Sequence, residues 1–235
     1  MCIPDILDRP TLKKIRAAIN EIGFDDGRRT DGRDAKRVKH NLELKTGSEK
    51  ANEVQVTVIK ALQRNMTFRQ AARPFYTHPP LISRYLEGMD CGLHVDDPLM
   101  GRPVSARSDI SVTVAISSPD EYDGGELVIH TPFGEQEVKL PAGSVVIYPS
   151  SSLHRVAPVS RGERLAAVTW VQSYVRNAQK REILYDLYRI REKMSGRDPD
   201  AREFALANKT YVNLLRMWSE TRCPVSEGRR GTPPE

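Results

Sequence analysis

Cysteine and histidine are scarce in this chain, and no apolar run is long enough to span a bilayer. The cysteines, Cys2, Cys91 and Cys223, form no CxxC pair, which argues against both a disulfide framework and a zinc ribbon. The first residues carry acids and prolines where a secretory signal would have a basic start followed by an apolar stretch. We therefore expect a cytoplasmic protein whose cysteines are thiols and which has no membrane partner.

The basic residues form no concentrated patch. The formal net charge is +5, but arginines and lysines alternate with acids, as in RRTDGRDAKRVKH. A nucleic-acid partner is disfavoured, because no basic stripe with interleaved aromatic residues is present. The charge pattern predicts a solvated surface and leaves the oligomeric state open.

Helical spacing dominates the first part of the chain. Residues 12–22 place Leu12, Ile15, Ile19 and Ile22 on one face, and a second apolar face follows Ser48. Residues 24–46 are polar, charged and rich in glycine, so we expect a long loop there. Within it, residues 25–40 are a candidate lid or substrate contact, with a solvated connection as the alternative.

After residue 79 the apolar residues alternate in the manner of strands. Seven short segments predict an antiparallel sandwich or barrel, namely LISRYLEG, SDISVTVAISS, GELVIHT, EQEVKL, GSVVIYPS, HRVAPV and ERLAAVTWVQSYV. In the second of these, Ile110 and Val112 point one way, while Ser111 and Thr113 point the other. Such a face of small residues leaves room for a ligand, although tight sheet packing explains it equally well.

Helical periodicity returns from residue 176, and two amphipathic helices are expected to cover the sheet or to form a partner surface. The predicted organisation comprises N-terminal helices and a long loop that belong to the catalytic unit (1–78), a strand-rich core (79–177), C-terminal helices (178–222) and a disordered tail (223–235).

The stretch GLHVDDP holds one imidazole and two carboxylates within four positions. If it is extended, alternation places His94 and Asp96 on one face and turns Asp97 away. His154 begins a predicted strand and is the best third ligand. Two histidines and one carboxylate in this order form the facial triad that holds Fe(II), although zinc hydrolases use similar donors.

Arg164 comes ten residues after His154, at the start of the next strand, where a hairpin would bring the two side by side. A guanidinium there could bind the carboxylate of a dicarboxylate cosubstrate in a bidentate manner. A surface salt bridge is the alternative for Arg164, and Arg107, Arg155 and Arg161 are the other candidates for the carboxylate-binding role.

These segments resemble the Fe(II)/2-oxoglutarate dioxygenases, and within them the bacterial PKHD-type (prolyl/lysyl-hydroxylase-like) hydroxylases linked to iron uptake. The resemblance spans roughly residues 20–185. It is carried by DDGRRTDGRDAKRVKHNLEL, SRYLEGMDCGLHVDD, RSDISVTVAIS, DEYDGGELVI and VKLPAGSVVIYPSSSLHRVAPVSRGERLAAVTWVQSYVR.

The resemblance implies an α+β fold with a double-stranded β-helix core, of the jelly-roll or cupin-like kind, on which the N-terminal helices pack and to which the C-terminal helices are appended. It implies Fe(II) held by His94, Asp96 and His154, and 2-oxoglutarate held by Arg164 with Tyr85 and Thr113 beside it. O2 is the co-reactant, and L-ascorbate the reductant that keeps the iron reduced.

The implied reaction hydroxylates a substrate while 2-oxoglutarate is decarboxylated to succinate and CO2. The substrate is a peptidyl proline or lysine, or a siderophore-type small molecule. A cupin-like sensor of iron or 2-oxoglutarate without turnover is the main rival, and a nucleic-acid demethylase is a weaker one.

The chain departs from the family at one position. Such proteins usually carry Tyr-Gly before the His-x-Asp motif, whereas this chain has Cys91-Gly92. We expect Cys91 to be a small apolar wall residue that does not ligate iron, although a thiol near the iron could also be oxidised. Gly124 and Gly125 are expected to permit a close turn beside the pocket, or simply an ordinary hairpin.

Overall fold

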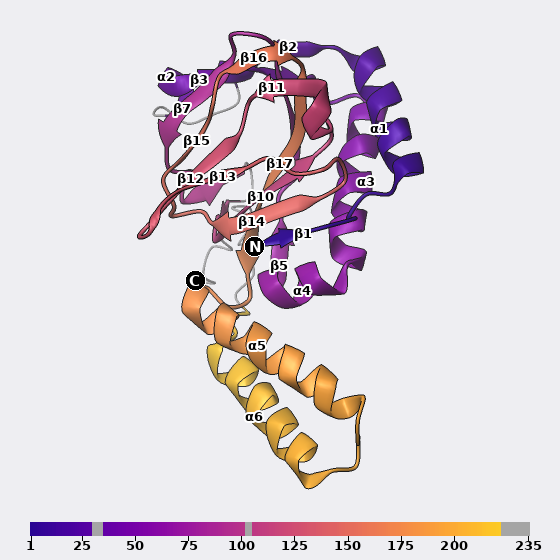
Figure 1. Cartoon of the computed structure of the whole chain (residues 1–235), viewed down its shortest axis with the longest axis vertical. Coiled ribbons are helices and arrows are strands. Elements are labelled where there is room, and N and C mark those ends of the chain that lie inside the picture. Colours follow the sequence, from indigo (N-terminus) through magenta and orange to yellow (C-terminus); the bar gives the residue numbers. More distant parts are fainter. Residues whose placement is uncertain (30–34, 102–104, 222–235) are drawn as a thin grey trace, which may run out of the picture.

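The computed structural model describes residues 1–29, 35–101 and 105–221. Two antiparallel sheets face each other and form the body of the molecule, with helices along one side and a helical hairpin at one end (Figure 1). This arrangement confirms the predicted α+β fold with a jelly-roll core. The predicted tail (223–235), with Cys223, lies outside the described residues.

The larger sheet has eight strands. In spatial order these are β1 (Cys2–Ile3), β14 (Val145–Pro149), β10 (Ile110–Ala115), β17 (Arg164–Ser173), β6 (Leu81–Tyr85), β4 (Leu42–Leu44) and β2 (Phe24–Asp26), with β5 (Pro74–Thr77) also paired to β17.

The smaller sheet has five strands. Its order is β13 (Gly134–Val138), β12 (Leu127–Thr131), β15 (His154–Val156), β7 (Asp90–His94) and β3 (Lys39–His40). Two further strand pairs are β11 (Tyr122–Gly124) with β16 (Val159–Gly162), and β8 (Leu99–Met100) with β9 (Ala106–Arg107).

Helices α1 (Arg9–Ile22) and α3 (Glu49–Arg64) pack on the outer face of the larger sheet. Asp8 caps α1 by accepting a hydrogen bond from the Thr11 amide (2.8 Å), and Ser48 caps α3 in the same way. The apolar faces of both helices bury Ile15, Ile19 and Val58 together with Val112 and Val114 of β10. Each such side chain contributes about 1.5–3 kcal/mol when fully buried.

The alternation along β10 decides what each face of the larger sheet does. Ile110, Val112 and Val114 belong to the core under the helices, whereas Ser111 and Thr113 point to the opposite face, between the two sheets. A second apolar cluster, which includes Tyr85 and Tyr148, fills part of that inter-sheet space. The small-residue face therefore borders a cavity, as one reading of the sequence predicted.

The prediction of a long loop over residues 24–46 is wrong. The segment contains β2, β3 and β4, a short helix η1 (Gly27–Arg29) and α2 (Ala35–Val38), and its strands extend both sheets. These strands have only two or three residues each and carry charged side chains. The alternation of apolar and polar residues is therefore too short to identify them as strands from the sequence. Part of the candidate lid, residues 30–34, lies outside the described residues.

Further differences concern strands and helices. The predicted strand HRVAPV is divided into β15 and β16, and Pro158 between them has no N–H to donate. Strand β7 was not among the seven predicted strands, although the motif around His94 was expected to be extended. Helix α4 (Met66–Ala72) follows α3 directly and was also not predicted, and η2 (Pro119–Glu121) precedes β11.

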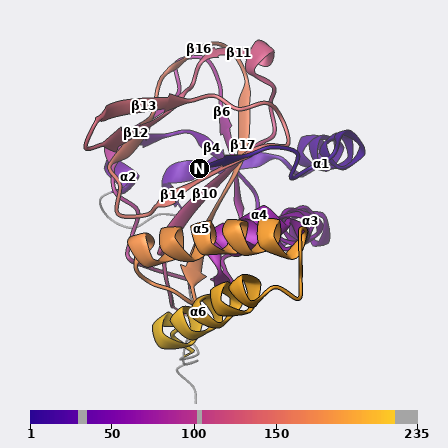
Figure 2. The same cartoon turned by 60° about the horizontal axis from the view of Figure 1, so that its bottom comes forward.

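The C-terminal helices do not cover the sheet. Helices α5 (Ala178–Ser195) and α6 (Arg202–Trp218) form a hairpin that projects from one end of the barrel and packs beside α4 (Figures 1 and 2). Their apolar faces contact each other in a small separate cluster around Leu184 and Tyr211. Helical periodicity shows only that one face of a helix is covered. It does not identify the element that covers this face, which here is the other helix of the hairpin. No helix in the described part of the chain has the length and apolar character to span a membrane.

Candidate active site

Strands β7 and β15 bring two histidines together. His94 and His154 are direct register partners, and their ring centroids lie 4.3 Å apart. Nδ1 of His94 is 2.8 Å from the Gly92 carbonyl, and Nδ1 of His154 is 3.0 Å from the Ser152 carbonyl. A neutral imidazole that donates from Nδ1 keeps a lone pair on Nε2. Both rings are therefore held with Nε2 as the available donor atom for a metal.

Asp96 lies just beyond the end of β7, on the same face as His94. Its carboxylate accepts a hydrogen bond from the Ser111 hydroxyl through Oδ2, and Oδ1 lies 3.8 Å from Nε2 of His154. One potential ligand atom from each of His94, Asp96 and His154 lies within 4.8 Å of the others. Asp97 is exposed, as the predicted alternation requires.

Burial sets the protonation of the groups around this cluster. The pKa of His154 is lowered from its ordinary value, mainly because burial disfavours the imidazolium, although the Asp96 carboxylate opposes this. The pKa of Tyr148 is raised well above its usual range, again mainly by burial. The Tyr148 ring lies 5.2 Å from that of His154. The site therefore holds a neutral imidazole and a protonated phenol at neutral pH.

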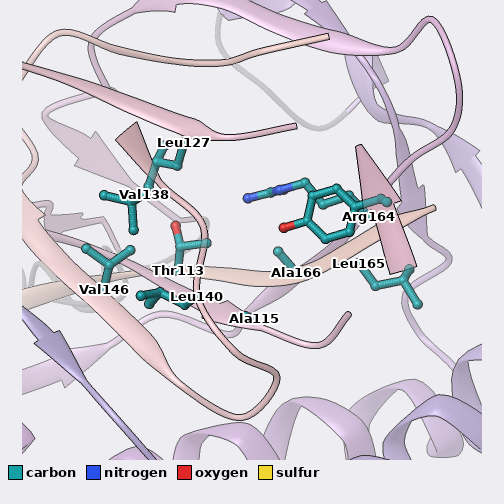
Figure 3. Close-up of a pocket in the computed structure, with 10 residues that line it drawn as sticks. Thr113, Ala115, Leu127, Val138, Leu140, Val146, Arg164, Leu165 and Ala166 are labelled. Atoms are coloured by element: carbon teal, nitrogen blue, oxygen red, sulfur yellow. The ribbon is translucent and has the colours of Figure 1, made fainter. Parts of the chain in front are cut away.

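Arg164 borders the same cavity from the opposite sheet. A space of about 60 Å³ is lined by the three clustered residues together with Tyr85, Thr113 and Arg164. An adjoining space of about 20 Å³ is also lined by Thr113 and Arg164. Figure 3 shows the Arg164 side chain extending into this second space toward Thr113 and Leu127. Tyr85 lines the first of these spaces with Arg164, and Thr113 lines both.

Arg164 is 7% exposed, and among the described residues no carboxylate forms an ion pair with it. Its guanidinium carbon lies 5.1 Å from the centroid of the Tyr85 ring, and Arg164 and Tyr122 line the same small space. Burial raises the pKa of the Tyr122 phenol. A buried cation without a counter-ion is costly, so this cavity favours an anionic ligand.

The other three candidate arginines are occupied. Arg107 is paired with Asp109 and Glu220, Arg155 with Glu135, and Arg161 with Asp123. The residues that line the cavity include Arg164 and none of these three.

The expected hairpin between His154 and Arg164 is wrong in its pairing. Strand β15 pairs with β7 and β12, β16 pairs with β11, and β17 pairs with strands of the larger sheet. Arg164 therefore faces the histidines across the cavity, from the other sheet, because the jelly-roll connection changes sheets between β15 and β17.

The two glycines of the YDGG turn allow Arg164 to lie there. Gly124 and Gly125 both have positive φ, at 68° and 65°. A Cβ on Gly124 would come within 2.1 Å of the Pro158 carbonyl oxygen, and one on Gly125 within 3.1 Å of Cδ of Arg164. The close turn beside the pocket is thus present as predicted.

Cys91 lies in the cavity wall. Its side chain is buried, and its sulfur lies 3.8 Å from Nδ1 of His94, the ring nitrogen directed at the Gly92 carbonyl. It is not one of the clustered potential ligands.

The sequence did not single out Ser111, Tyr148, Tyr122 or Lys39. Ser111 orients Asp96, Tyr148 packs against His154, Tyr122 contacts Arg164, and Lys39 lines the cavity while paired with Glu43. For Ser111 the only signal was its place on the small-residue face of β10.

Two comparisons with known sequences agree. The family model of the 2OG-Fe(II) oxygenase superfamily matches residues 80–172. A PKHD-type hydroxylase of Synechococcus sp. (strain JA-2-3B'a(2-13)) is 47% identical over 221 residues, which cover 94% of this chain and 99% of the relative. A PKHD-type hydroxylase of Pseudomonas putida (strain W619) is 42% identical over 93% of this chain and 98% of its own length.

Solved structures show the same fold at low sequence identity. A viral collagen prolyl hydroxylase from Paramecium Bursaria Chlorella virus-1 superposes with a TM-score of 0.52 at 15% identity, covering 74% of this chain and 95% of the neighbour. A prolyl hydroxylase from Trichoplax adhaerens gives 0.52 at 13% identity, covering 78% and 86%. The two PKHD-type hydroxylases match nearly the whole of this chain over nearly the whole of their own length. On that ground this chain belongs to the PKHD-type hydroxylases of the 2OG-Fe(II) oxygenase superfamily.

Proposed function

We propose that this protein hydroxylates a peptidyl proline or lysine, or a siderophore-type small molecule, and that it couples this to decarboxylation of 2-oxoglutarate. The observation that carries the proposal is one cavity that contains both a His-Asp-His cluster and a buried arginine lacking a counter-ion among the described residues.

His94, Asp96 and His154 would hold Fe(II). Two neutral imidazole nitrogens and one carboxylate oxygen are the donor set of the facial triad, and the backbone carbonyls of Gly92 and Ser152 already fix both tautomers. The Ser111 hydroxyl occupies Oδ2 of Asp96, which leaves Oδ1 toward His154. The donor set therefore fits Fe(II) before any metal is present. Bound Fe(II), with 2-oxoglutarate and O2, supplies the oxidising chemistry that hydroxylates a C–H bond while the cosubstrate becomes succinate and CO2.

Arg164 would bind the distal carboxylate of 2-oxoglutarate. Its planar guanidinium can donate two parallel hydrogen bonds to a carboxylate, and its burial strengthens them. The Tyr122 phenol stays protonated because its pKa is raised, so it remains available as a donor. The Thr113 hydroxyl and the Tyr85 ring complete this end of the cavity. These groups orient the cosubstrate so that its keto acid end is directed toward His94, Asp96 and His154.

The proposal divides the chain into four parts. Residues 1–78 belong to the catalytic unit, which is supported by the contribution of β1, β2, β3 and β4 to the two sheets. Residues 79–177 form the dioxygenase core, 178–222 the C-terminal helices and 223–235 the tail. We also propose a cytoplasmic location, which agrees with the cysteine usage. L-ascorbate is the proposed reductant.

The test is an assay of purified protein with Fe(II), 2-oxoglutarate, ascorbate and O2. Succinate is measured by mass spectrometry with and without proline-containing peptides, lysine-containing peptides and siderophores. We expect succinate formation that a substrate stimulates, together with a product heavier by one oxygen atom. Arg164→Ala is the matched control, because it removes the arginine proposed to bind 2-oxoglutarate. Tight binding of 2-oxoglutarate with no succinate under any of these conditions would favour the sensor and contradict the proposal.

A further inference from the structure

A second pocket lies where the helical hairpin joins the barrel. Its volume is about 430 Å³, and its wall includes Arg69 and Arg73 from the end of α4, Tyr174 after β17, and Tyr211 and Ser219 from α6 and its C-terminus. It shares no lining residue with the cavity that holds His94 and Arg164. Figures 1 and 2 show α4, α5 and α6 meeting at this end of the molecule.

The pocket lies at the opposite end of β17 from Arg164. Strand β17 begins at Arg164 and ends at Ser173, next to Tyr174. Ten residues of extended chain span about 30 Å. A ligand in this pocket would therefore lie far from Arg164, and it would contact none of the residues that line the active-site cavity.

Arg73 is the central residue of this pocket. It is 7% exposed, and Nη2 lies 3.1 Å from the Tyr211 hydroxyl and 3.4 Å from the Leu184 carbonyl. Its Nε is buried without an acceptor, and no hydrogen bond links Nη1 to any other described residue. The side chain thus has donor capacity that its described neighbours leave unused.

The backbone of Arg73 is strained at this position. It ends α4 in the left-handed conformation, with φ of 47° and ψ of 58°. For a residue other than glycine this costs about 1–2 kcal/mol. Strain of this kind persists where the surroundings hold it, and it concentrates at functional positions. Here it accompanies a guanidinium that lies against the Tyr211 ring, 5.3 Å from its centroid.

Positive charge exceeds negative charge around the pocket. Among the described residues, neither Arg69 nor Arg73 forms an ion pair with a carboxylate, and Arg191 contacts the same Tyr211 ring at 4.3 Å. The nearby Glu220 is already bound to Arg107, at 3.0 Å. The ring of Tyr211 offsets only part of the cost of a buried cation, at about 0.5–2 kcal/mol for each contact.

We infer that this pocket binds an oxyanion with two negative charges, either a phosphate group or a dicarboxylate, through Arg73 and Arg69. Nη1 of Arg73 supplies an unused donor from the buried side, and the exposed Arg69 contacts the anion from the rim. The hydroxyl of Tyr174 is a further donor at the rim. The anion would provide the counter-charge that the described residues do not.

The experiment measures anion binding by calorimetry, with inorganic phosphate and with succinate in separate titrations, at constant ionic strength set by sodium chloride. The protein is the full chain without added metal, as wild type and as Arg69→Ala, Arg73→Gln, Arg164→Ala and Arg202→Ala. Arg202 is an exposed arginine at the start of α6, so its variant matches the charge change of Arg69→Ala without touching the pocket.

We expect saturable binding of at least one of the two anions to wild type, Arg164→Ala and Arg202→Ala. In Arg69→Ala the dissociation constant should rise about tenfold, which is the loss of one charge-assisted hydrogen bond. Arg73→Gln should bind still more weakly. Comparison of phosphate with succinate in Arg164→Ala identifies the kind of anion, because Arg164 itself is proposed to bind a dicarboxylate.

Three results would overturn the inference. The first is the absence of saturable binding of either anion to wild type. The second is equal affinity in Arg69→Ala and Arg202→Ala, because the binding would then lie elsewhere. The third is loss of all binding in Arg164→Ala, which would assign the anion to the active-site cavity. Arg69 is exposed, so its variant keeps the test valid even if Arg73→Gln fails to fold.

Discussion

His94 and His154 are register partners on adjacent strands, and each donates from Nδ1 to the backbone carbonyl two residues before it. The two imidazoles are thus held by the same local device, one on β7 and one on β15. Backbone carbonyls cannot change protonation state, so the groups that orient both rings do not titrate. This pre-organisation leaves both Nε2 atoms available on one side of the smaller sheet.

We expect His94→Ala and His154→Ala each to weaken Fe(II) binding by about 100-fold or more, since loss of a ligand should cost at least as much as loss of a supporting residue. Anaerobic titration of Fe(II) measures the effect. His130→Ala is the control, because His130 pairs with Glu135 on the β12–β13 hairpin. Full iron occupancy in either ligand variant would show that the triad is assigned incorrectly.

The two carboxylates of the HVDD stretch should differ sharply. Asp96→Ala should abolish turnover, because its carboxylate is one of three clustered donors. Asp97→Ala should leave Fe(II) binding nearly unchanged, because the side chain of Asp97 is exposed and turned away. Succinate formation and iron occupancy are measured for both variants. Greater damage from Asp97→Ala would mean that the register after β7 is wrong.

Ser111 acts on the metal site through Asp96. Ser111→Ala removes the hydroxyl that holds the Asp96 carboxylate, so the carboxylate is free to rotate. We expect the Fe(II) affinity to fall by about 10–100-fold, as is typical when a supporting hydrogen bond to a metal ligand is lost. Ser108→Ala is the matched control, since its hydroxyl bonds to the Asp97 carbonyl instead. Equal iron affinity in Ser111→Ala and wild type would contradict this role.

The sequence predicted the chemistry of the site better than its spatial arrangement. His94 and Asp96 follow from strand alternation, which is a local property, and their placement could be predicted. The position of Arg164 across the cavity depends on which strands pair, and a ten-residue spacing suggested a hairpin that the jelly roll does not form. Ser111 was not predicted, because a serine on a small-residue face carries no signal until the fold brings Asp96 beside it.

Burial of His78 makes stability depend on pH. Its side chain is 4% exposed, and burial lowers its pKa below the ordinary value of 6.5. As pH falls below 6.5, the unfolded chain takes up a proton before the folded protein does, so the free energy of unfolding decreases. Urea unfolding of the metal-free protein at several pH values measures this loss. His78→Gln should show a weaker decrease, and an unchanged decrease would assign it to other groups.

Arg164 should select 2-oxoglutarate. Its buried guanidinium has no counter-ion among the described residues, and its fork can pair with both oxygens of the distal carboxylate. Arg164→Ala should weaken cosubstrate binding by about 2–5 kcal/mol, as expected when a buried charge pair loses one partner. Arg164→Lys should weaken it less, since lysine retains the charge but not the bidentate geometry. Anaerobic titration of 2-oxoglutarate into the Fe(II) protein, followed by the metal-to-ligand charge-transfer band, gives the affinity.

Arg155→Ala is the control for Arg164→Ala, because Arg155 pairs with Glu135 outside the cavity. Iron affinity should hardly change in any of these variants, since no arginine belongs to the cluster of potential ligands. Unchanged 2-oxoglutarate affinity in Arg164→Ala would mean that another group holds the carboxylate.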